Sequence, residues 1–123
     1  MHNYKYYNSN PNQLRIKDCV YRAISTATGL CYEAVCNLLD ITAEYYSCDK
    51  LCVCCYSYLL EDLLCYRRFD CDFKLTVQDV ALKYPNNKLI IRVAEHLTSS
   101  LNGTILDIWD CSEEFVDCYW IIT

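Results

Sequence analysis

The first half of the chain places apolar residues at helical spacing. Between Asp18 and Gly29, alanine and isoleucine side chains recur on one face of a helix. Aspartate is favourable just before a helix and glycine just after one. We therefore expect a helix from Cys19 to about Thr28. A second helix is expected over about residues 32–39, where apolar positions recur in the same way.

The middle of the chain, from Tyr45 to Arg68, is apolar on several faces, and we expect one or two helices there. One stripe at helical spacing consists of Cys48, Cys52, Cys55 and Leu59. A further helix is expected after Thr76, because Thr76 and Asp79 resemble a capping box with Asp in place of Glu. Pro85 ends that helix, since proline cannot continue it.

The last third of the chain has the pattern of β-strands. Short runs rich in β-branched residues occupy positions 88–93 and 115–122. Residues 96–109 are divided by Asn102-Gly103, which is the strongest two-residue hairpin signal. This order predicts an α+β fold in which N-terminal helices pack on a C-terminal antiparallel sheet.

The length and composition indicate one domain. The chain has 123 residues and no linker rich in proline, glycine or serine, so we expect a single domain over residues 1–123. Residues 1–12 are polar and rich in tyrosine and asparagine. They are expected to form a flexible arm or an edge strand rather than a signal peptide.

The charge argues against two classes of partner. The net charge is −5, and the lysines and arginines are scattered. Since nucleic-acid-binding proteins usually present a basic face, no nucleic-acid partner is expected. No segment reaches the ~18 apolar residues of a membrane span. We therefore expect a cytoplasmic protein without a membrane partner.

The cysteines need an explanation, because eleven occur in so short a chain. A disulfide framework is one interpretation. The odd number and the absence of an export signal favour the other, in which reduced cysteines pack as small apolar residues. Cys52-x-x-Cys55 is half of a zinc site, but a second pair is missing. Structural zinc is thus the less favoured alternative, and we expect no metal or cofactor.

Cys19 is the candidate nucleophile. At the first turn of a helix, its sulfur would lie near unpaired N–H groups and the positive end of the dipole, which lowers a thiol pKa. The alternative is one core thiol among many. His96 is the candidate base, because the only other histidine, His2, lies in the N-terminal arm. A lone strand histidine can also be purely structural.

The expected hairpin suggests a third catalytic residue. With a two-residue turn, His96 and Asp107 are diagonal neighbours on one face. A carboxylate there would orient the imidazole, as in a catalytic triad. A turn with an odd number of residues would bring Asp110 to that face instead. We favour Asp107, because Asn-Gly favours an even loop.

Two polar residues flank the expected nucleophile. Gln13 lies six residues before Cys19. Its amide could donate to a developing oxyanion together with the backbone N–H of Cys19, or it could simply be solvated. Arg22, one turn along the helix, could face the site or pair with Asp18. Pairing with Asp18 is the favoured role.

The order Gln13, Cys19, His96, Asp107 resembles that of the papain-like cysteine peptidases, which use an oxyanion Gln, a nucleophilic Cys, a His and an Asn or Asp. The chain is small, and in this it is similar to the double-glycine leader peptidases. The stretches QLRIKDCVYRAISTATGLCYEAV and LTVQDVALKYPNNKLIIRVAEHLTSSLNGTILDIWD, with the terminal YW, resemble a family of small bacteriophage proteins. These carry Asp-Cys-x-x-Arg-Ala, Gly-His-Leu and Asp-x-Trp-Asp; here Glu95 replaces the glycine before the histidine.

The resemblance implies a papain-like cysteine hydrolase that performs peptidase- or amidase-type acyl transfer. It further implies a viral protein in a bacterial cytoplasm, with a protein or peptide substrate, a host protein among the candidates. The alternative is a catalytically inactive papain-like protein that binds and inhibits a host system. Exposed tyrosines, such as Tyr45 and Tyr46, would then serve as anchors.

Overall fold

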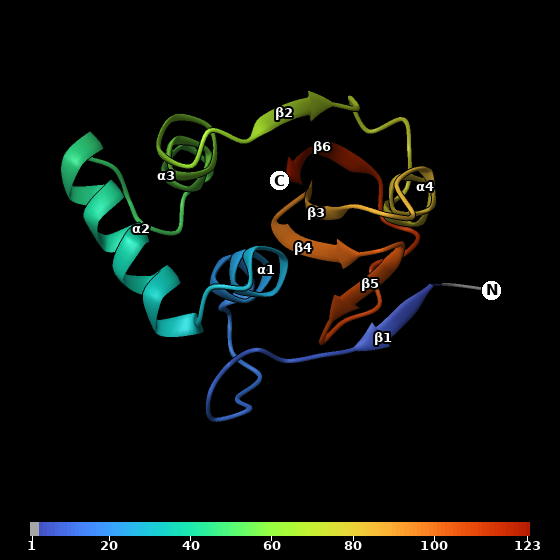
Figure 1. Cartoon of the computed structure of the whole chain (residues 1–123), viewed down its shortest axis with the longest axis horizontal. Helices are drawn as coiled ribbons and strands as arrows, with labels where there is room; N and C mark the ends of the chain where they lie inside the picture. Colours follow the sequence, from blue (N-terminus) through green and yellow to red (C-terminus); the bar gives the residue numbers. More distant parts are fainter. Residues whose placement is uncertain (1–2) are drawn as a thin grey trace.

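A computed structural model describes residues 3–123 of the chain. Four α-helices, one π-helix and six strands follow one another along these residues (Figure 1). Their order is β1 (Tyr4–Tyr6), α1 (Cys19–Thr28), α2 (Tyr32–Tyr46), α3 (Val53–Ser57), η1 (Tyr58–Leu63), β2 (Arg67–Asp70), α4 (Val77–Lys83), β3 (Lys88–Val93), β4 (His96–Leu101), β5 (Thr104–Asp107) and β6 (Val116–Ile122). The predicted α+β class is confirmed.

The six strands form one sheet in the order β1-β5-β4-β3-β6-β2. Most neighbours are antiparallel, but β1 runs parallel to β5, with Tyr4 opposite Ile105. The C-terminal strands β3 to β6 pair antiparallel, as predicted, but the N-terminal strand β1 makes the whole sheet mixed. Of the two alternatives for the N-terminal segment, a flexible arm or an edge strand, residues 4–6 form the edge strand. They pair with the free edge of β5, which lies far away in the sequence.

Helices cover both faces of the sheet. Ile90 of β3 lies in the core cluster under α1, α2 and α3, whereas its neighbours Leu89 and Ile91 lie in the cluster under α4. This alternation follows from the period of two along a strand. Figure 1 shows α1 lying beside β4. This arrangement brings Cys19 of α1 towards His96 of β4.

The middle segment departs most from expectation. Helix α2 continues to Tyr46 instead of ending near residue 39, and a break over residues 47–52 interrupts the expected cysteine stripe. The segment expected to be helical ended at Arg68, but its last two residues begin strand β2, which is Arg67–Asp70. The reason is tertiary: β2 pairs with β6, and Phe69 stacks on Tyr119 with ring centroids 5.3 Å apart.

The local signals at two other elements are confirmed. Thr76 and Asp79 form the capping box of α4, each side chain accepting a hydrogen bond from the other residue's backbone N–H. Asn102 and Gly103 both have positive φ angles, of 51° and 84°. Because these angles fit the two-residue hairpin turn, Leu101 pairs with Thr104 and Ser99 with Leu106, in the predicted register.

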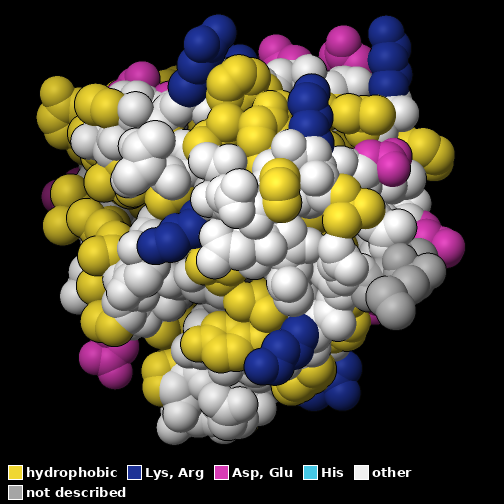
Figure 2. Space-filling view, turned by 45° about the vertical axis from the view of Figure 1, so that its right-hand side comes forward, with side chains coloured by type: hydrophobic (Ala, Val, Ile, Leu, Met, Phe, Trp, Pro, Cys, Tyr) yellow, Lys and Arg dark blue, Asp and Glu magenta, His cyan; other side chains and the backbone are white. Residues whose placement is uncertain are grey.

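The basic side chains form no single patch on the surface that Figure 2 shows, and the cysteines are not paired. On the face in Figure 2, Lys and Arg side chains lie in separate places rather than in one patch. No helix within residues 3–123 has the length and apolar character to cross a membrane. All eleven cysteines belong to the described chain, and none of them is in a disulfide.

Candidate active site

Cys19 is the first residue of α1, and the start of this helix has no side-chain cap. Asp18 precedes it, but its carboxylate makes no capping hydrogen bond to the helix. Instead, Asp18 accepts hydrogen bonds from Arg22 Nε (2.6 Å), Asn10 Nδ2 (3.0 Å) and Tyr32 Oη (2.7 Å). The backbone N–H of Cys19 therefore lies at an uncapped helix start, where anions are favoured.

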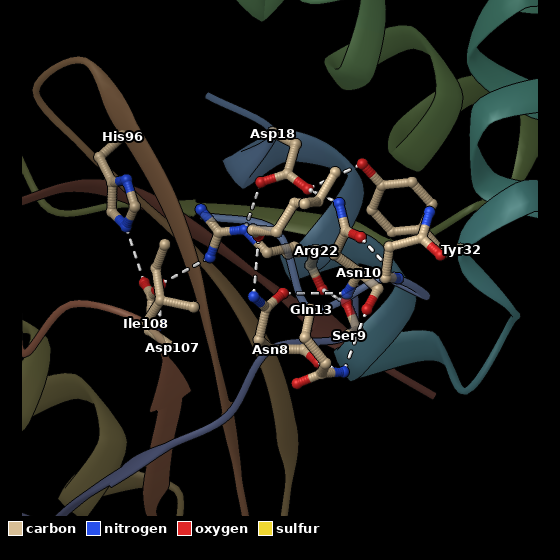
Figure 3. Close-up of polar contacts among 12 residues, drawn as sticks. Asn8, Ser9, Asn10, Gln13, Asp18, Arg22, Tyr32, His96, Asp107 and Ile108 are labelled. Atoms are coloured by element: carbon tan, nitrogen blue, oxygen red, sulfur yellow. Dashed lines mark hydrogen bonds and ion pairs between the residues drawn. The ribbon is translucent and has the colours of Figure 1, made fainter. Parts of the chain in front are cut away.

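His96, which is partly buried, and Asp107, which is buried, form a pair at the start of β4 and the end of β5. His96 Nε2 lies 2.7 Å from Asp107 Oδ2, and Asp107 is only 2% exposed. The other carboxylate oxygen, Oδ1, accepts from Arg22 Nη1 at 2.9 Å and from the Ile108 N–H at 2.7 Å. Figure 3 shows Asp107 between His96 and Arg22. With Nε2 engaged, Nδ1 is the ring nitrogen available to Cys19.

Trp109 flanks the histidine. The two rings meet edge to face, with centroids 4.9 Å apart, and Trp109 is half exposed. This contact fixes the imidazole from one side while Asp107 holds it from another.

The environment favours a thiolate–imidazolium pair. Burial by itself raises the pKa of Cys19, but hydrogen bonds with His96 and the Leu97 backbone, and the charges of His96 and Arg22, outweigh it and lower that pKa. Burial likewise lowers the pKa of His96, yet hydrogen bonds with Asp107, Cys111 and Cys19 raise it to about 11. Both pKa shifts mean that the charged forms, the Cys19 thiolate and the His96 imidazolium, are stabilised.

The pair is reached from two surface hollows. One of about 190 Å³ is lined by Val20, Leu51, Val53, Tyr56, Arg92 and Leu97 in addition to Cys19, Glu95 and His96. The other, of about 510 Å³, shares these last three residues and adds Ile16, Lys17, Arg22, Ile108 and Trp109. Cys19 thus lies where two hollows meet. A third hollow, of about 520 Å³, shares Val53 and Arg92 with the first but is lined by neither Cys19 nor His96.

Gln13 does not join the other predicted site residues. It is exposed, and its side-chain nitrogen donates to the carbonyls of Asn8 and Asn10, both at 3.1 Å. It lines neither hollow that contains Cys19. The amide N–H groups are thus used to close their own polar loop, and the predicted oxyanion role has no geometric support here.

Asp110, the alternative third residue, has a different partner. It is exposed, and its Oδ1 accepts from both the backbone N–H and the hydroxyl of Ser112. It therefore stabilises the turn after β5. The structure brings Asp107 to His96, as the two-residue turn predicted.

The sequence left two roles open for Arg22, and the structure shows both, because Arg22 pairs with Asp18 and also reaches Asp107. The contact of Cys111 with the site was not predicted. The thiol of Cys111, 1% exposed, lies 3.9 Å from Asp107 Oδ2. The sequence spacing of Asp18 and Arg22 signalled their pairing, whereas nothing local to residue 111 signalled its contact with the site.

His96, Asp107 and Cys111 are also the one group of three possible metal ligands within residues 3–123. The Arg22 guanidinium already supplies a positive charge beside Asp107. A second cation there would be repelled. Cys52, of the half zinc motif, instead accepts a hydrogen bond from the Cys55 N–H at the start of α3.

Comparisons with protein-family models, curated proteins and solved structures find no match to this chain.

Proposed function

We propose that this protein is a papain-like cysteine hydrolase with Cys19 as nucleophile, His96 as acid and base, and Asp107 as the residue that orients His96. One observation carries the proposal. A thiol with a lowered pKa lies at an uncapped helix start, next to a histidine held by a buried carboxylate, and at the meeting point of two hollows. Perturbed groups that converge at a cleft are typical of active sites.

The chemistry follows from the resting ion pair. The Cys19 thiolate attacks the carbonyl carbon, and the carbonyl oxygen gains a negative charge near the N–H groups at the start of α1. His96 then gives its proton to the leaving amine, so the C–N bond breaks and an acyl thioester remains. Water attacks the thioester while His96 takes its proton, so the C–S bond breaks, the acid is released and the Cys19 thiolate and His96 imidazolium are restored.

The substrate we propose is a polypeptide, and by resemblance to the phage family a host protein in a bacterial cytoplasm. Cys19 lines two hollows, so chain segments before and after the scissile bond could each find a place. This part rests on analogy to the family and is tested separately from the chemistry.

The chemistry is tested by the alkylation rate of each thiol with iodoacetamide as a function of pH, read by mass spectrometry. Cys19 should react with a midpoint well below the ~8.5 of a free thiol, and His96→Ala should raise that midpoint. Cys31 is a matched internal control, because it is exposed and also stands at a helix start. A Cys19 midpoint equal to that of Cys31 would overturn the assignment.

The substrate is tested by labelling new protein N-termini in bacterial lysate treated with wild-type protein or with Cys19→Ala. Cleavage sites present only with the wild-type protein support a peptidase. If Cys19 is activated but no new termini form, the substrate is another acyl compound, such as a side-chain amide or an isopeptide.

A binding protein is the second candidate, favoured by one observation. Tyr45 on α2 is 76% exposed and contacts Tyr46, which stacks on Tyr58 with centroids 4.2 Å apart. Such exposed aromatic groups serve as interface anchors. Binding to a host protein that survives Cys19→Ala but is lost on Tyr45→Ala would favour this function.

A further inference from the structure

Arg22 is a buried arginine between two buried aspartates. Its exposed fraction is 6%, and those of Asp18 and Asp107 are both 2%. Arg22 Nε lies 2.6 Å from Asp18 Oδ1, and Arg22 Nη1 lies 2.9 Å from Asp107 Oδ1. Buried charges of this kind are costly unless fully paired, so the arrangement needs a reason beyond stability.

We propose that Arg22 is a positioning residue that couples the helix bearing the nucleophile to the Asp107–His96 pair. The inference rests on the proposed function. Arg22 lies one turn after Cys19 on α1, whereas Asp107 ends β5, so one guanidinium joins the helix that carries Cys19 to the carboxylate that holds His96. A planar guanidinium holds two carboxylates through separate nitrogens in a fixed geometry, whereas lysine has only one rotatable nitrogen for both.

The hydrogen bonds around Asp107 show how Arg22 acts on His96. Oδ1 is occupied by Arg22 Nη1 and by the Ile108 N–H, and this leaves Oδ2 to face His96 Nε2. Rotation of the carboxylate would break both bonds to Oδ1. Figure 3 shows this chain of contacts running from His96 through Asp107 and Arg22 to Asp18.

The far end of the guanidinium is anchored as well. Asp18 accepts from Asn10 and Tyr32 in addition to Arg22, so its carboxylate is held from three sides. The arginine therefore bridges two carboxylates that are both held by other groups. A shift of α1 would move Arg22 and, through it, the Asp107 carboxylate.

Arg22 also balances the charge of the site. Two aspartates and one arginine leave a single negative charge, which the imidazolium of His96 neutralises. Without Arg22, Asp107 would lose a donor and face a second buried carboxylate, which favours its neutral form. A neutral Asp107 would no longer stabilise the imidazolium. Two further titratable groups contact Asp107: the Cys111 thiol lies 3.9 Å from Oδ2, and the Tyr4 hydroxyl donates to the Asp107 backbone carbonyl.

The test is the pH profile of Cys19 alkylation in Arg22→Met and Arg22→Lys. Arg22→Met should raise the midpoint by at least one pH unit, which is about a tenfold slower reaction below the wild-type midpoint. Arg22→Lys should fall between Arg22→Met and wild type, since lysine restores the charge but not the two-sided contact. Arg68→Met, which removes an arginine that is half exposed and paired with Glu61 and Asp70, should leave the profile unchanged.

A double-variant cycle separates positioning from general destabilisation. If Arg22 acts through Asp107, then Arg22→Met added to Asp107→Asn should shift the midpoint no further than Asp107→Asn alone. Additive shifts would overturn the inference. Should Arg22→Met fail to fold, Arg22→Gln is the substitute, because it removes the charge but keeps hydrogen-bond donors. It should raise the midpoint as well, and an unchanged midpoint overturns the inference.

The outcomes also separate this inference from the proposed function. A wild-type Cys19 with an ordinary thiol midpoint refutes the hydrolase assignment itself. A lowered wild-type midpoint that persists in folded Arg22→Met refutes the role of Arg22 alone.

Discussion

At the scale of single residues, what distinguishes Cys19 from other buried thiols is its partner. Burial raises the pKa of Cys55 and that of Cys118 to about 12, and no cation offsets it enough. Burial acts on Cys19 in the same direction, but His96 and Arg22 reverse the outcome. In a chain so rich in cysteine, local charge rather than residue type selects the reactive thiol.

Asp107→Asn should inactivate Cys19 even though asparagine can fill the same role in papain-like enzymes. Arg22 and the Ile108 N–H both donate to one oxygen, so the amide oxygen must remain there and its NH₂ group would face His96. That contact favours a neutral imidazole. We expect alkylation of Cys19 at pH 7 to slow at least about tenfold, measured by mass spectrometry; an unchanged rate contradicts the proposed orientation.

Gln13→Ala should change acyl transfer less than twofold, because the amide donates to its own loop and not toward Cys19. The readout is acylation of Cys19 by a p-nitrophenyl ester, since alkylation forms no oxyanion. Glu95→Gln, which changes a residue that lines both hollows, is the matched control, and its acylation rate is compared with that of Gln13→Ala. A loss above about tenfold in folded Gln13→Ala would mean that the loop rearranges when an acyl substrate binds.

At the scale of elements, the β4–β5 hairpin carries the pairing of His96 with Asp107. The turn needs left-handed backbone angles at Asn102 and Gly103, which glycine adopts freely. Strand β4 begins with His96 and strand β5 ends with Asp107, so both residues lie at the end of the hairpin away from the turn. The site thus depends on the register of a single hairpin packed against α1.

Gly103→Ala should lower the free energy of unfolding by ~1–2 kcal/mol, because its φ of +84° is unfavourable for an L-residue. The closest atom to an added Cβ is Pro85 Cα at 3.5 Å, an ordinary contact, so crowding adds little. Gly29→Ala, at φ +79° with nothing within 4 Å, is the matched control. Urea denaturation should give similar losses for both, and a much larger loss for Gly103→Ala would point to crowding.

At the scale of the whole molecule, the site joins a helical layer to the sheet through buried charges. The pKa of Asp107 is lowered despite its burial, chiefly by the hydrogen bond with His96. The pKa of His96 is raised to about 11. The ion pair therefore contributes to folding over a wide pH range, and its loss at either end should be visible as a change in stability.

The unfolding free energy should show this contribution with a definite sign. The part due to His96 is fully present below pH 6.5, its ordinary pKa, and is lost as pH rises towards 11. The part due to Asp107 is present above 3.8 and is lost as pH falls. The difference between wild type and His96→Ala should therefore be largest at about pH 4–6.5, of order 3–5 kcal/mol for a broken buried pair, and shrink by pH 10. Urea midpoints at each pH measure it, and a pH-independent difference contradicts it.

The sequence by itself determined the elements whose signals are local. Helix α1, the capping box of α4 and the Asn102-Gly103 hairpin depend on contacts between residues a few positions apart, so composition and spacing sufficed. Those elements place Cys19 at a helix start and His96 beside Asp107.

Tertiary structure decided the rest. The strands β1 and β2, the contact of Arg22 with Asp107 and the burial of Cys111 beside the site all join residues far apart in the chain. The orientation of Gln13 depended on which carbonyls its folded loop left free. No local propensity encodes such pairings, because their free energy arises only when the sheet and α1 come together and exclude water from the charges between them.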